Sequence, residues 1–191
     1  MKSHFFAYIA RMRYITRWAL MRNTFSENIQ EHSHMVAVLA HALAVIRNRV
    51  YGGNIDAGQV ALAALYHDAS EIITGDMPTP IKYYAPEIRD AYKKVEAVAC
   101  DRLLSMLPDE LKPDYAPVLE CADRDILTLV KAADKLSAYI KCVEELKAGN
   151  AEFRRAAEQT RAALDAMALP ELDYFMEHCM ESFSMTLDEL E

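Results

Sequence analysis

Three apolar segments of this chain each contain side chains that are costly to bury. The run from 61 to 66 is continuously apolar and ends in His67-Asp68. His32 and Asp134 each fall on the apolar face of another segment with helical spacing. An imidazole or a carboxylate in such a place loses its hydration unless another group uses its lone pairs. One divalent cation would satisfy all of these side chains, which constrains the chain to fold with three helices converging on one point.

The composition favours helices throughout. The chain has 191 residues, of which 52% are hydrophobic and only 5 are Gly. This length suits one domain with an ordinary core. No stretch of useful length alternates Val, Ile or Thr with polar residues, as a half-buried strand would. We therefore predict an all-α, single-domain helical bundle spanning residues 1–191.

Capping residues predict where the long helices begin and end. Asn28 with Glu31, and Asp56 with Gln59, match the capping-box pattern at the start of a helix. These boxes predict helices over 28–49 and 56–68. A third long helix is expected over 122–147, stopped by Gly149. Between the second and third, a loop over 74–80 is expected, and further breaks are expected at three prolines: Pro108, Pro113 and Pro117.

Charge and cysteine usage restrict the partners and the compartment. The formal net charge is -8 and the pI is near 5.3, which disfavours a polymeric nucleic acid as partner. A small phosphorylated substrate needs only a few local cations and stays possible. The 4 cysteines form no C-x-x-C pair, which favours free thiols in a reducing compartment. The first apolar stretch is short and soon meets Arg11 and Arg13, so we expect a cytoplasmic protein without a leader or a membrane span.

The candidate metal ligands are His32, His67, Asp68 and Asp134. Two imidazoles and two carboxylates form a mixed nitrogen and oxygen set that suits a borderline transition metal. Such a set also leaves coordination positions for water and substrate. Each residue has a plainer interpretation. A lone His on an apolar face is often a hydrogen-bonded core residue, and Asp134 could pair with a neighbouring lysine on its own helix.

The order of these residues resembles a known pattern. His32, His67-Asp68 and Asp134 match the H…HD…D pattern of the HD-domain metal-dependent phosphohydrolases. More of the chain resembles one branch, the bacterial 5′-deoxynucleotidases of the YfbR type. The segments that carry this resemblance are Arg17-Trp18, Arg22-Asn23, Glu27-Asn28, Glu31-His32-Ser33, Tyr66-His67-Asp68-Ala69-Ser70-Glu71, Thr74-Gly75-Asp76, Pro78-Thr79-Pro80 and Asp173-Tyr174-Phe175-Met176.

The resemblance implies an activity, a cofactor and an assembly. Members of that family are homodimeric all-α enzymes that hydrolyse 2′-deoxyribonucleoside 5′-monophosphates to deoxyribonucleoside and phosphate. They use a divalent metal ion, for which Co, Mn and Zn are all suitable here. By position, the metal ligands would be the four residues named above. The residues that would border the substrate are Arg17, Trp18, His32, Asp68, Asp76, Met77, Pro78, Thr79 and Asp134.

Residue chemistry suggests catalytic roles for Arg17, Glu71 and Asp76. The guanidinium of Arg17 offers forked donors to phosphate oxygens, which a lysine could not reproduce. Glu71 lies one helical turn after Asp68 and is our candidate for acid or base work. Asp76, in a loop stiffened by prolines, could contact a sugar hydroxyl or share that work. As alternatives, Arg17 and Glu71 could be solvated charges and Asp76 an ordinary turn residue. Trp18 could stack on a base or line the sugar pocket, or it could simply fill a core.

Two other functions stay open at this point. The first is another HD-domain phosphohydrolase, such as a cyclic-nucleotide phosphodiesterase or a nucleoside triphosphate hydrolase. Dinuclear members need extra histidines, and this chain has none between His67 and His178. A triphosphate would favour more cations than Arg17, Arg22 and Lys82. The second is a non-catalytic nucleotide-binding module that keeps the scaffold without turnover.

Overall fold

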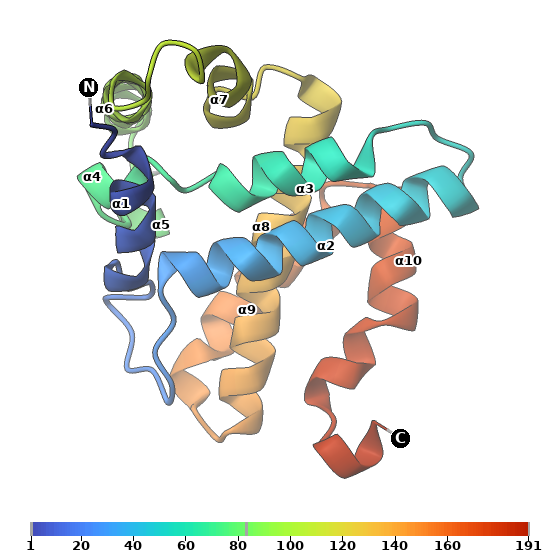
Figure 1. Cartoon of the computed structure of the whole chain (residues 1–191). Coiled ribbons are helices and arrows are strands. Elements are labelled where there is room, and N and C mark those ends of the chain that lie inside the picture. The colour runs from blue at the N-terminus through green and yellow to red at the C-terminus, as the bar shows by residue number, and fades with distance from the viewer. Residues whose placement is uncertain (1, 83, 191) are drawn as a thin grey trace.

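The computed structural model describes residues 2–82 and 84–190, and helices account for its regular structure (Figure 1). Within those residues only an isolated bridge between Thr16 and Asn28 has β geometry. The all-α prediction is confirmed. The elements in chain order are α1 Phe5–Ile9, η1 Ala10–Tyr14, α2 Ile29–Val50, α3 Ala57–Tyr66, α4 Glu71–Thr74, α5 Thr79–Lys82, α6 Pro86–Ser105, α7 Lys112–Leu119, α8 Arg124–Lys147, η2 Ala151–Phe153, α9 Arg154–Asp165, α10 Pro170–His178, η3 Met180–Ser184 and η4 Leu187–Glu189.

Caps fix the ends of the helices that carry the candidate ligands. The side chain of Asn28 accepts hydrogen bonds from the backbone of α2, and Glu31 completes the expected capping box. Asp56 caps α3 by accepting from the backbone N–H of Gln59 at 3.0 Å. Gly149 follows α8 with a φ of +85°, a conformation that costs a glycine little. The sequence-based limits of these helices are confirmed to within about two residues, the usual uncertainty of helix ends.

The proline-rich region differs from the prediction. Instead of a broken segment, residues 112–119 form the helix α7. Pro113 lies in the first turn, where its missing N–H has no intrahelical partner to lose. Pro117 is inside the helix, and α7 ends two residues later at Leu119. A short helix therefore tolerates both prolines.

The core lies where α2, α3 and α8 pack against one another. Figure 1 shows α2 and α3 running side by side with α8 crossing behind them. Leu43, Leu129 and Leu136 are fully buried there. Burying such a side chain contributes about 1.5–3 kcal/mol, so this packing fixes the three helices relative to one another. Any side chain that points to their meeting place is thereby positioned as well. No helix among the described residues is long and apolar enough to span a membrane.

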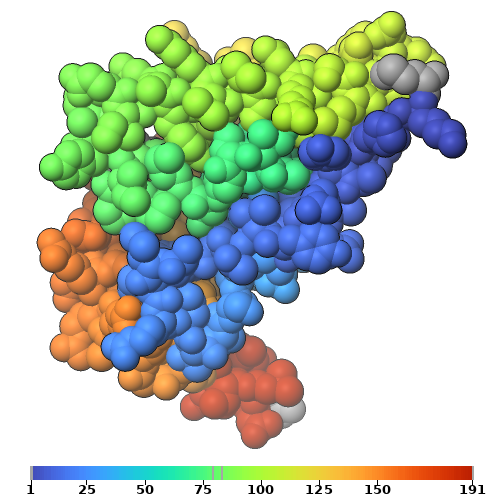
Figure 2. Space-filling model, turned by 90° about the vertical axis from the view of Figure 1, so that its left-hand side faces the viewer, coloured from blue at the N-terminus to red at the C-terminus, as the bar shows by residue number. Residues whose placement is uncertain are grey.

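Residues 15–28, which we call the 15–28 loop, join η1 to α2. The backbone closes the base of this loop, because Ile29 donates to the carbonyl of Ile15 at 3.0 Å and Arg17 donates to that of Glu27 at 2.9 Å. Figure 2 shows the blue loop lying against the orange segment that follows α8. The loop thus bridges the N-terminal helices and the α8–α9 junction.

Candidate metal centre

Helix packing brings the predicted ligands together from three parts of the chain. His32 lies in the first turn of α2 and is fully buried. His67 and Asp68 directly follow α3, and Asp134 is in the middle of α8. The ligand atoms of His32, His67 and Asp68 all lie within 4.8 Å of one another. Asp134 is outside that group of three but touches its edge, and its side chain is 40% exposed, so it borders the site instead of facing a closed core.

The spacing of these atoms fits a cation. His32 Nε2 lies 3.0 Å from Asp134 Oδ1 and 3.6 Å from Asp68 Oδ2. His67 Nε2 lies 3.2 Å from the same Asp68 oxygen and 4.0 Å from Asp134 Oδ1. Neighbouring ligand atoms around an ion with bonds of about 2.1 Å are about 3.0–3.4 Å apart. The cluster is therefore close to a coordination geometry.

The two imidazoles are oriented by their outer nitrogens. His67 Nδ1 lies 2.7 Å from the carbonyl oxygen of Ala64, an acceptor, so that nitrogen carries the proton. In the neutral ring that a metal ion would bind, the Nε2 of His67 then carries the lone pair, and this buried atom makes no hydrogen bond to the described residues. His32 Nδ1 lies 3.3 Å from the hydroxyl of Ser137, which leaves its Nε2 facing the carboxylates. Outer contacts of this kind hold histidine ligands of metals.

The electrostatics of the cluster favour a bound positive charge. Burial opposes a charge on His67, but the carboxylates of Asp68 and Asp134 raise its pKa to about 9. Burial would likewise raise the pKa values of both carboxyls, yet the neighbouring imidazoles hold them below their ordinary range. Two ionised carboxylates in so little space attract either protons or a cation. A divalent ion would replace the proton that these carboxylates favour on His67.

Arg17 borders the cluster from the 15–28 loop. Its Nη1 donates to Asp68 Oδ2 at 3.4 Å, and its Nε donates to Glu27 Oε2 at 3.2 Å. Burial opposes the charge, but Asp68, Asp134 and Glu27 raise the pKa of the guanidinium. The predicted solvated alternative does not hold, because the side chain is only 13% exposed. Arg17 is a fixed cation at the edge of the site.

Trp18 lies beside Arg17 but packs away from the cluster. Its ring contacts Phe153 with centroids 5.3 Å apart, and its Nε1 donates to Glu27 Oε2 at 3.1 Å. Its backbone has a φ of +58°, a left-handed conformation that a residue with a side chain adopts only when its surroundings hold it there. The core-filling interpretation thus has direct support in this structure, while contact with a substrate stays a prediction.

Glu71 and Asp76 are both carboxylic acids whose pKa is raised by burial. Glu71 is 5% exposed, and its Oε2 is buried without a hydrogen-bond partner among the described residues. Burial, with Asp68 and Asp76 nearby, raises its pKa to about 9 although Arg17 acts in the opposite direction. Burial also raises the pKa of Asp76. A protonated carboxyl at neutral pH is consistent with acid work, and it contradicts the solvated alternative for Glu71.

The remaining predicted substrate contacts lie in the segment between α4 and α5. Met77 and Pro78 are half-buried there. Thr79 begins α5, and its side chain lies outside the described part of the chain. Tyr92 anchors the start of this segment, because its hydroxyl donates to the carbonyl of Gly75 at 3.3 Å. Asp76 therefore follows an anchored glycine.

Sequence reasoning assigned no role to Ser137 or Glu27. Ser137 lies one helical turn after Asp134, so the spacing alone could have placed its hydroxyl behind the metal site. Glu27 accepts hydrogen bonds from both Arg17 and Trp18. No rule of sequence spacing predicts contacts between residues this far apart in a loop. Identifying Glu27 needed the structure.

The fold is the helical fold of the HD-domain phosphohydrolases. An HD-domain phosphohydrolase of Listeria innocua superposes with a TM-score of 0.81 at 20% identity, covering 94% of this chain and 88% of that one. A cyanophage S-2L HD phosphohydrolase, solved with dA and one catalytic Zn²⁺ ion, gives a TM-score of 0.61 at 24% identity over 92% of this chain and 96% of its own. These likenesses concern the fold.

Sequence comparison resolves the family. The model of the 5′-deoxynucleotidase YfbR-like family matches residues 4–183. A 5′-deoxynucleotidase of Photobacterium profundum is 52% identical over 99% of this chain and 98% of its own length. The 5′-deoxynucleotidase YfbR of Escherichia coli is 49% identical over 99% of this chain and 96% of its own. This chain belongs to the YfbR-like 5′-deoxynucleotidase family.

Proposed function

We propose that this protein is a metal-dependent phosphomonoesterase that hydrolyses 2′-deoxyribonucleoside 5′-monophosphates to deoxyribonucleoside and phosphate. The observation that carries the proposal is the buried Nε2 of His67, which makes no hydrogen bond within residues 2–82 and 84–190 and faces two carboxylates beside a fixed guanidinium. Membership of the YfbR-like family supports the reaction, since its relatives are named 5′-deoxynucleotidases. The dA and Zn²⁺ of the cyanophage phosphohydrolase support the chemical class of ligand.

The cation would be held by His32, His67, Asp68 and Asp134. The close spacing of their ligand atoms and the bare lone pair of His67 fit such a group. When bound, a divalent ion supplies Lewis acidity to a water molecule and neutralises phosphate charge. Mixed nitrogen and oxygen ligands accept Co, Mn or Zn, and we propose one ion per chain. Ser137 and the carbonyl of Ala64 would keep the imidazoles in the required orientation.

Arg17 would bind the phosphate. Its guanidinium carries five N–H donors, and the contacts to Glu27 and Asp68 leave others to bind phosphate oxygens. Phosphoryl transfer spreads negative charge over the equatorial oxygens, so a fixed cation stabilises the transition state more than the ground state. Glu27 prevents the guanidinium from turning to solvent. It would therefore act by positioning Arg17.

Glu71 would hold the proton that the reaction moves. A pKa near 9 keeps its carboxyl protonated at neutral pH, and the proton can pass to the departing 5′ oxygen of the nucleoside. Asp76 is the second candidate for this step. We propose instead that Asp76, with Met77, Pro78 and Thr79, borders the sugar, where an anchored loop leaves no room or partner for a 2′-hydroxyl. Trp18 would close the other side of the nucleoside pocket.

We further propose that the active protein is a cytoplasmic homodimer of single-domain chains spanning 1–191. The family resemblance supports the dimer. Exposed apolar side chains on α2 and α3, such as Val38, Val45 and Leu65, offer surface for a second copy. A membrane or a polymeric nucleic acid is not among the proposed partners, given the net charge of -8. Light scattering of the purified protein tests the dimer directly.

Phosphate release from a nucleotide panel tests the proposed reaction. The panel contains ribo- and deoxyribonucleoside 5′-monophosphates, the deoxynucleoside triphosphates and cyclic nucleotides, each with Co, Mn or Zn. We expect release from the deoxyribonucleoside monophosphates and little from their ribose counterparts. Release confined to triphosphates or cyclic nucleotides would replace this function with another HD-type reaction. Nucleotide binding without any release would identify a non-catalytic module.

A further inference from the structure

A second polar cluster, on the same face of α8 as Asp134, anchors the 15–28 loop. Asp134, Ser137, Lys141 and Glu145 follow one another at spacings of three and four residues, which places them on one side of the helix. Lys141 is 3% exposed and Glu145 is fully buried. With a rise of about 1.5 Å per residue, Glu145 lies about 16 Å along α8 from Asp134. One rigid helix therefore carries both clusters.

The contacts of the second cluster end on the backbone of the loop. The carboxylate of Glu145 accepts from the N–H of Thr24, at 2.9 Å and 3.1 Å to its two oxygens. Lys141 Nζ donates to the carbonyl of Phe25 at 2.6 Å and to Glu145, and it also lies 3.8 Å from the centre of the Phe25 ring. Buried side chains that bind backbone groups fix the path of a loop, whatever side chains the loop itself carries.

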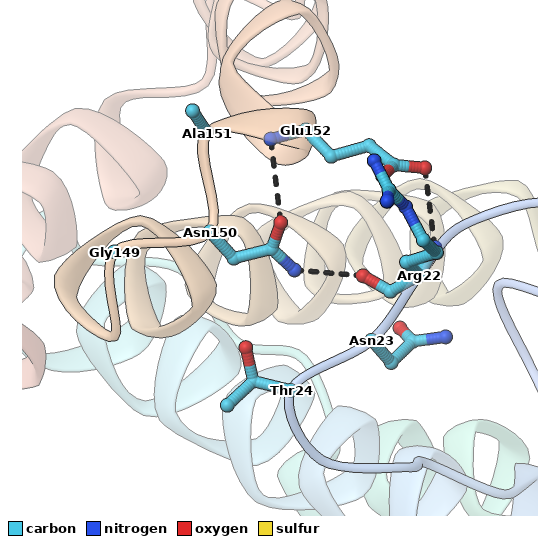
Figure 3. Close-up of a pocket in the computed structure, with 7 residues that line it drawn as sticks. All are labelled: Arg22, Asn23, Thr24, Gly149, Asn150, Ala151 and Glu152. Carbon is cyan, nitrogen blue, oxygen red and sulfur yellow. Dashed lines mark hydrogen bonds and ion pairs between the residues drawn. The ribbon is translucent and has the colours of Figure 1, made fainter.

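The junction that follows α8 adds to this anchor (Figure 3). The amide of Asn150 donates to the carbonyl of Arg22 at 2.7 Å and to Glu145 Oε2 at 2.8 Å. Glu152 accepts from the backbone N–H and the side chain of Arg22. Arg22, Asn150 and Glu152 line a surface cavity of about 450 Å³ whose lining includes none of the candidate metal ligands. The cavity is a by-product of the anchor, and we assign it no ligand.

The loop needs such an anchor. Trp18 is held with a φ of +58°, and its ring packs on Phe153 at the start of the segment after α8. Arg17 precedes it and must stay against Asp68. Burial alone would raise the pKa of Glu145, but the hydrogen bonds from Lys141, Asn150 and Thr24 hold it at about 2. The anchor therefore stays charged and intact over the neutral range.

We propose that Lys141 and Glu145 are positioning residues that hold the 15–28 loop so that Arg17 stays beside the metal centre while Trp18 stays packed against Phe153. The effect on catalysis rests on the proposed function, whereas the effect on the loop does not. Neither residue touches the cation site, so their loss should lower kcat/KM without changing metal content. The chain contains a single Trp, which lies in the loop and reports its packing directly.

The test compares Glu145→Gln with Glu171→Gln. Glu171 is a matched control, because it is 1% exposed and is paired with Arg47 at the α2–α10 contact. Without substrate or metal, we expect Glu145→Gln to shift Trp18 emission to the red and to increase its quenching by acrylamide, while Glu171→Gln leaves both unchanged. With 2′-deoxyadenosine 5′-monophosphate, kcat/KM should fall at least about 10-fold in Glu145→Gln at unchanged metal content, while Glu171→Gln stays within about 3-fold of the parent.

Unchanged quenching in a folded Glu145→Gln variant would overturn the proposal, and so would equal changes in both variants. If Glu145→Gln does not fold, Thr24→Pro is the second variant, since it removes the donor from the exposed loop and leaves α8 unaltered. Thr24→Pro should give the same red shift of Trp18 emission. An unshifted emission spectrum would contradict the proposal that these contacts anchor the loop. If the parent protein releases no phosphate, the proposed function fails while the fluorescence comparison still decides the role of the anchor.

Discussion

The two polar clusters of α8 differ in how completely their atoms are paired. Around Glu145, the carboxylate, the ammonium of Lys141 and the amide of Asn150 all have partners within hydrogen-bond distance. Around Asp134, the Nε2 of His67 and the Oε2 of Glu71 are buried and make no hydrogen bond to any residue that the structure describes. A buried polar atom left unpaired costs about 1–3 kcal/mol, so two of them in one cluster favour a bound partner there. The paired cluster stabilises the loop, and the unpaired one is the proposed binding site.

This contrast explains why the same residue types serve different ends. Both clusters contain carboxylates on one face of a single helix. Near Glu145 the positive charge comes from a lysine of the same helix. Near Asp134, Arg17 supplies part of the positive charge. The carboxylates of Asp68 and Asp134 lie against the two imidazoles and still attract a cation.

Removing a ligand should abolish the binding site. His67→Ala and Asp134→Ala each delete a proposed metal-binding atom, so we expect both bound metal and turnover to fall to the detection limit. Elemental analysis and phosphate release measure the two quantities on the same sample. Either variant retaining full metal and activity would show that the unpaired cluster is not a metal site.

Replacing Glu71 should separate chemistry from binding. Glu71→Gln keeps the size of the side chain but removes its ionisable proton, so kcat should fall by about 10²- to 10⁴-fold. Metal content and KM should stay near those of the parent. Single-turnover kinetics make the comparison. Near-normal kcat would transfer the acid or base role to Asp76.

Losing the contact behind His32 should weaken the site without destroying it. Ser137→Ala removes the hydroxyl beside His32 Nδ1, and we expect metal affinity to fall by about 10- to 100-fold. Ser33→Ala is the control, because Ser33 is also buried and its hydroxyl has no hydrogen-bond partner among the described residues. Competition with a metal indicator measures both variants. Equal affinity in the two would remove Ser137 from the site.

The stability of the metal-free protein should depend on pH through Glu71. Its pKa is raised from 4.5 to about 9 on folding, so the folded state keeps a proton that the unfolded state loses. This contribution is fully present below pH 4.5 and is lost as the pH rises towards 9, with a slope of up to about 1.4 kcal/mol per pH unit. Glu71→Gln should therefore unfold at higher urea than the parent at pH 8, with the gap closing near pH 5. A constant gap would contradict a buried, protonated Glu71.

Much of the fold could be predicted because its signals are local. Helix starts are indicated by capping residues such as Asn28 and Asp56, which hydrogen-bond to the backbone two or three positions further on. The end of α8 is indicated by Gly149. The proline region was predicted less well. Pro113 and Pro117 read as breaks, whereas a helix of eight residues accommodates one in its first turn and one near its end.

The candidate site could be predicted only in part. Periodicity placed His32 and Asp134 on inward faces, and the order of His67-Asp68 supplied the resemblance. Contacts between distant segments carry no such signal. The hydrogen bonds of Glu27 to Arg17 and of Glu145 to Thr24 depend on how the 15–28 loop folds back over α8, and no spacing rule describes that path.

Titration of the metal-free protein with Co²⁺ tests the central claim most directly, because the ion reports its own ligands through visible absorption. We predict that the absorption saturates at one equivalent per chain in the parent and in Glu171→Gln, and that it is lost in His67→Ala. Absence of saturable absorption in the parent, or its survival in His67→Ala, would contradict a cation site built on the unpaired cluster.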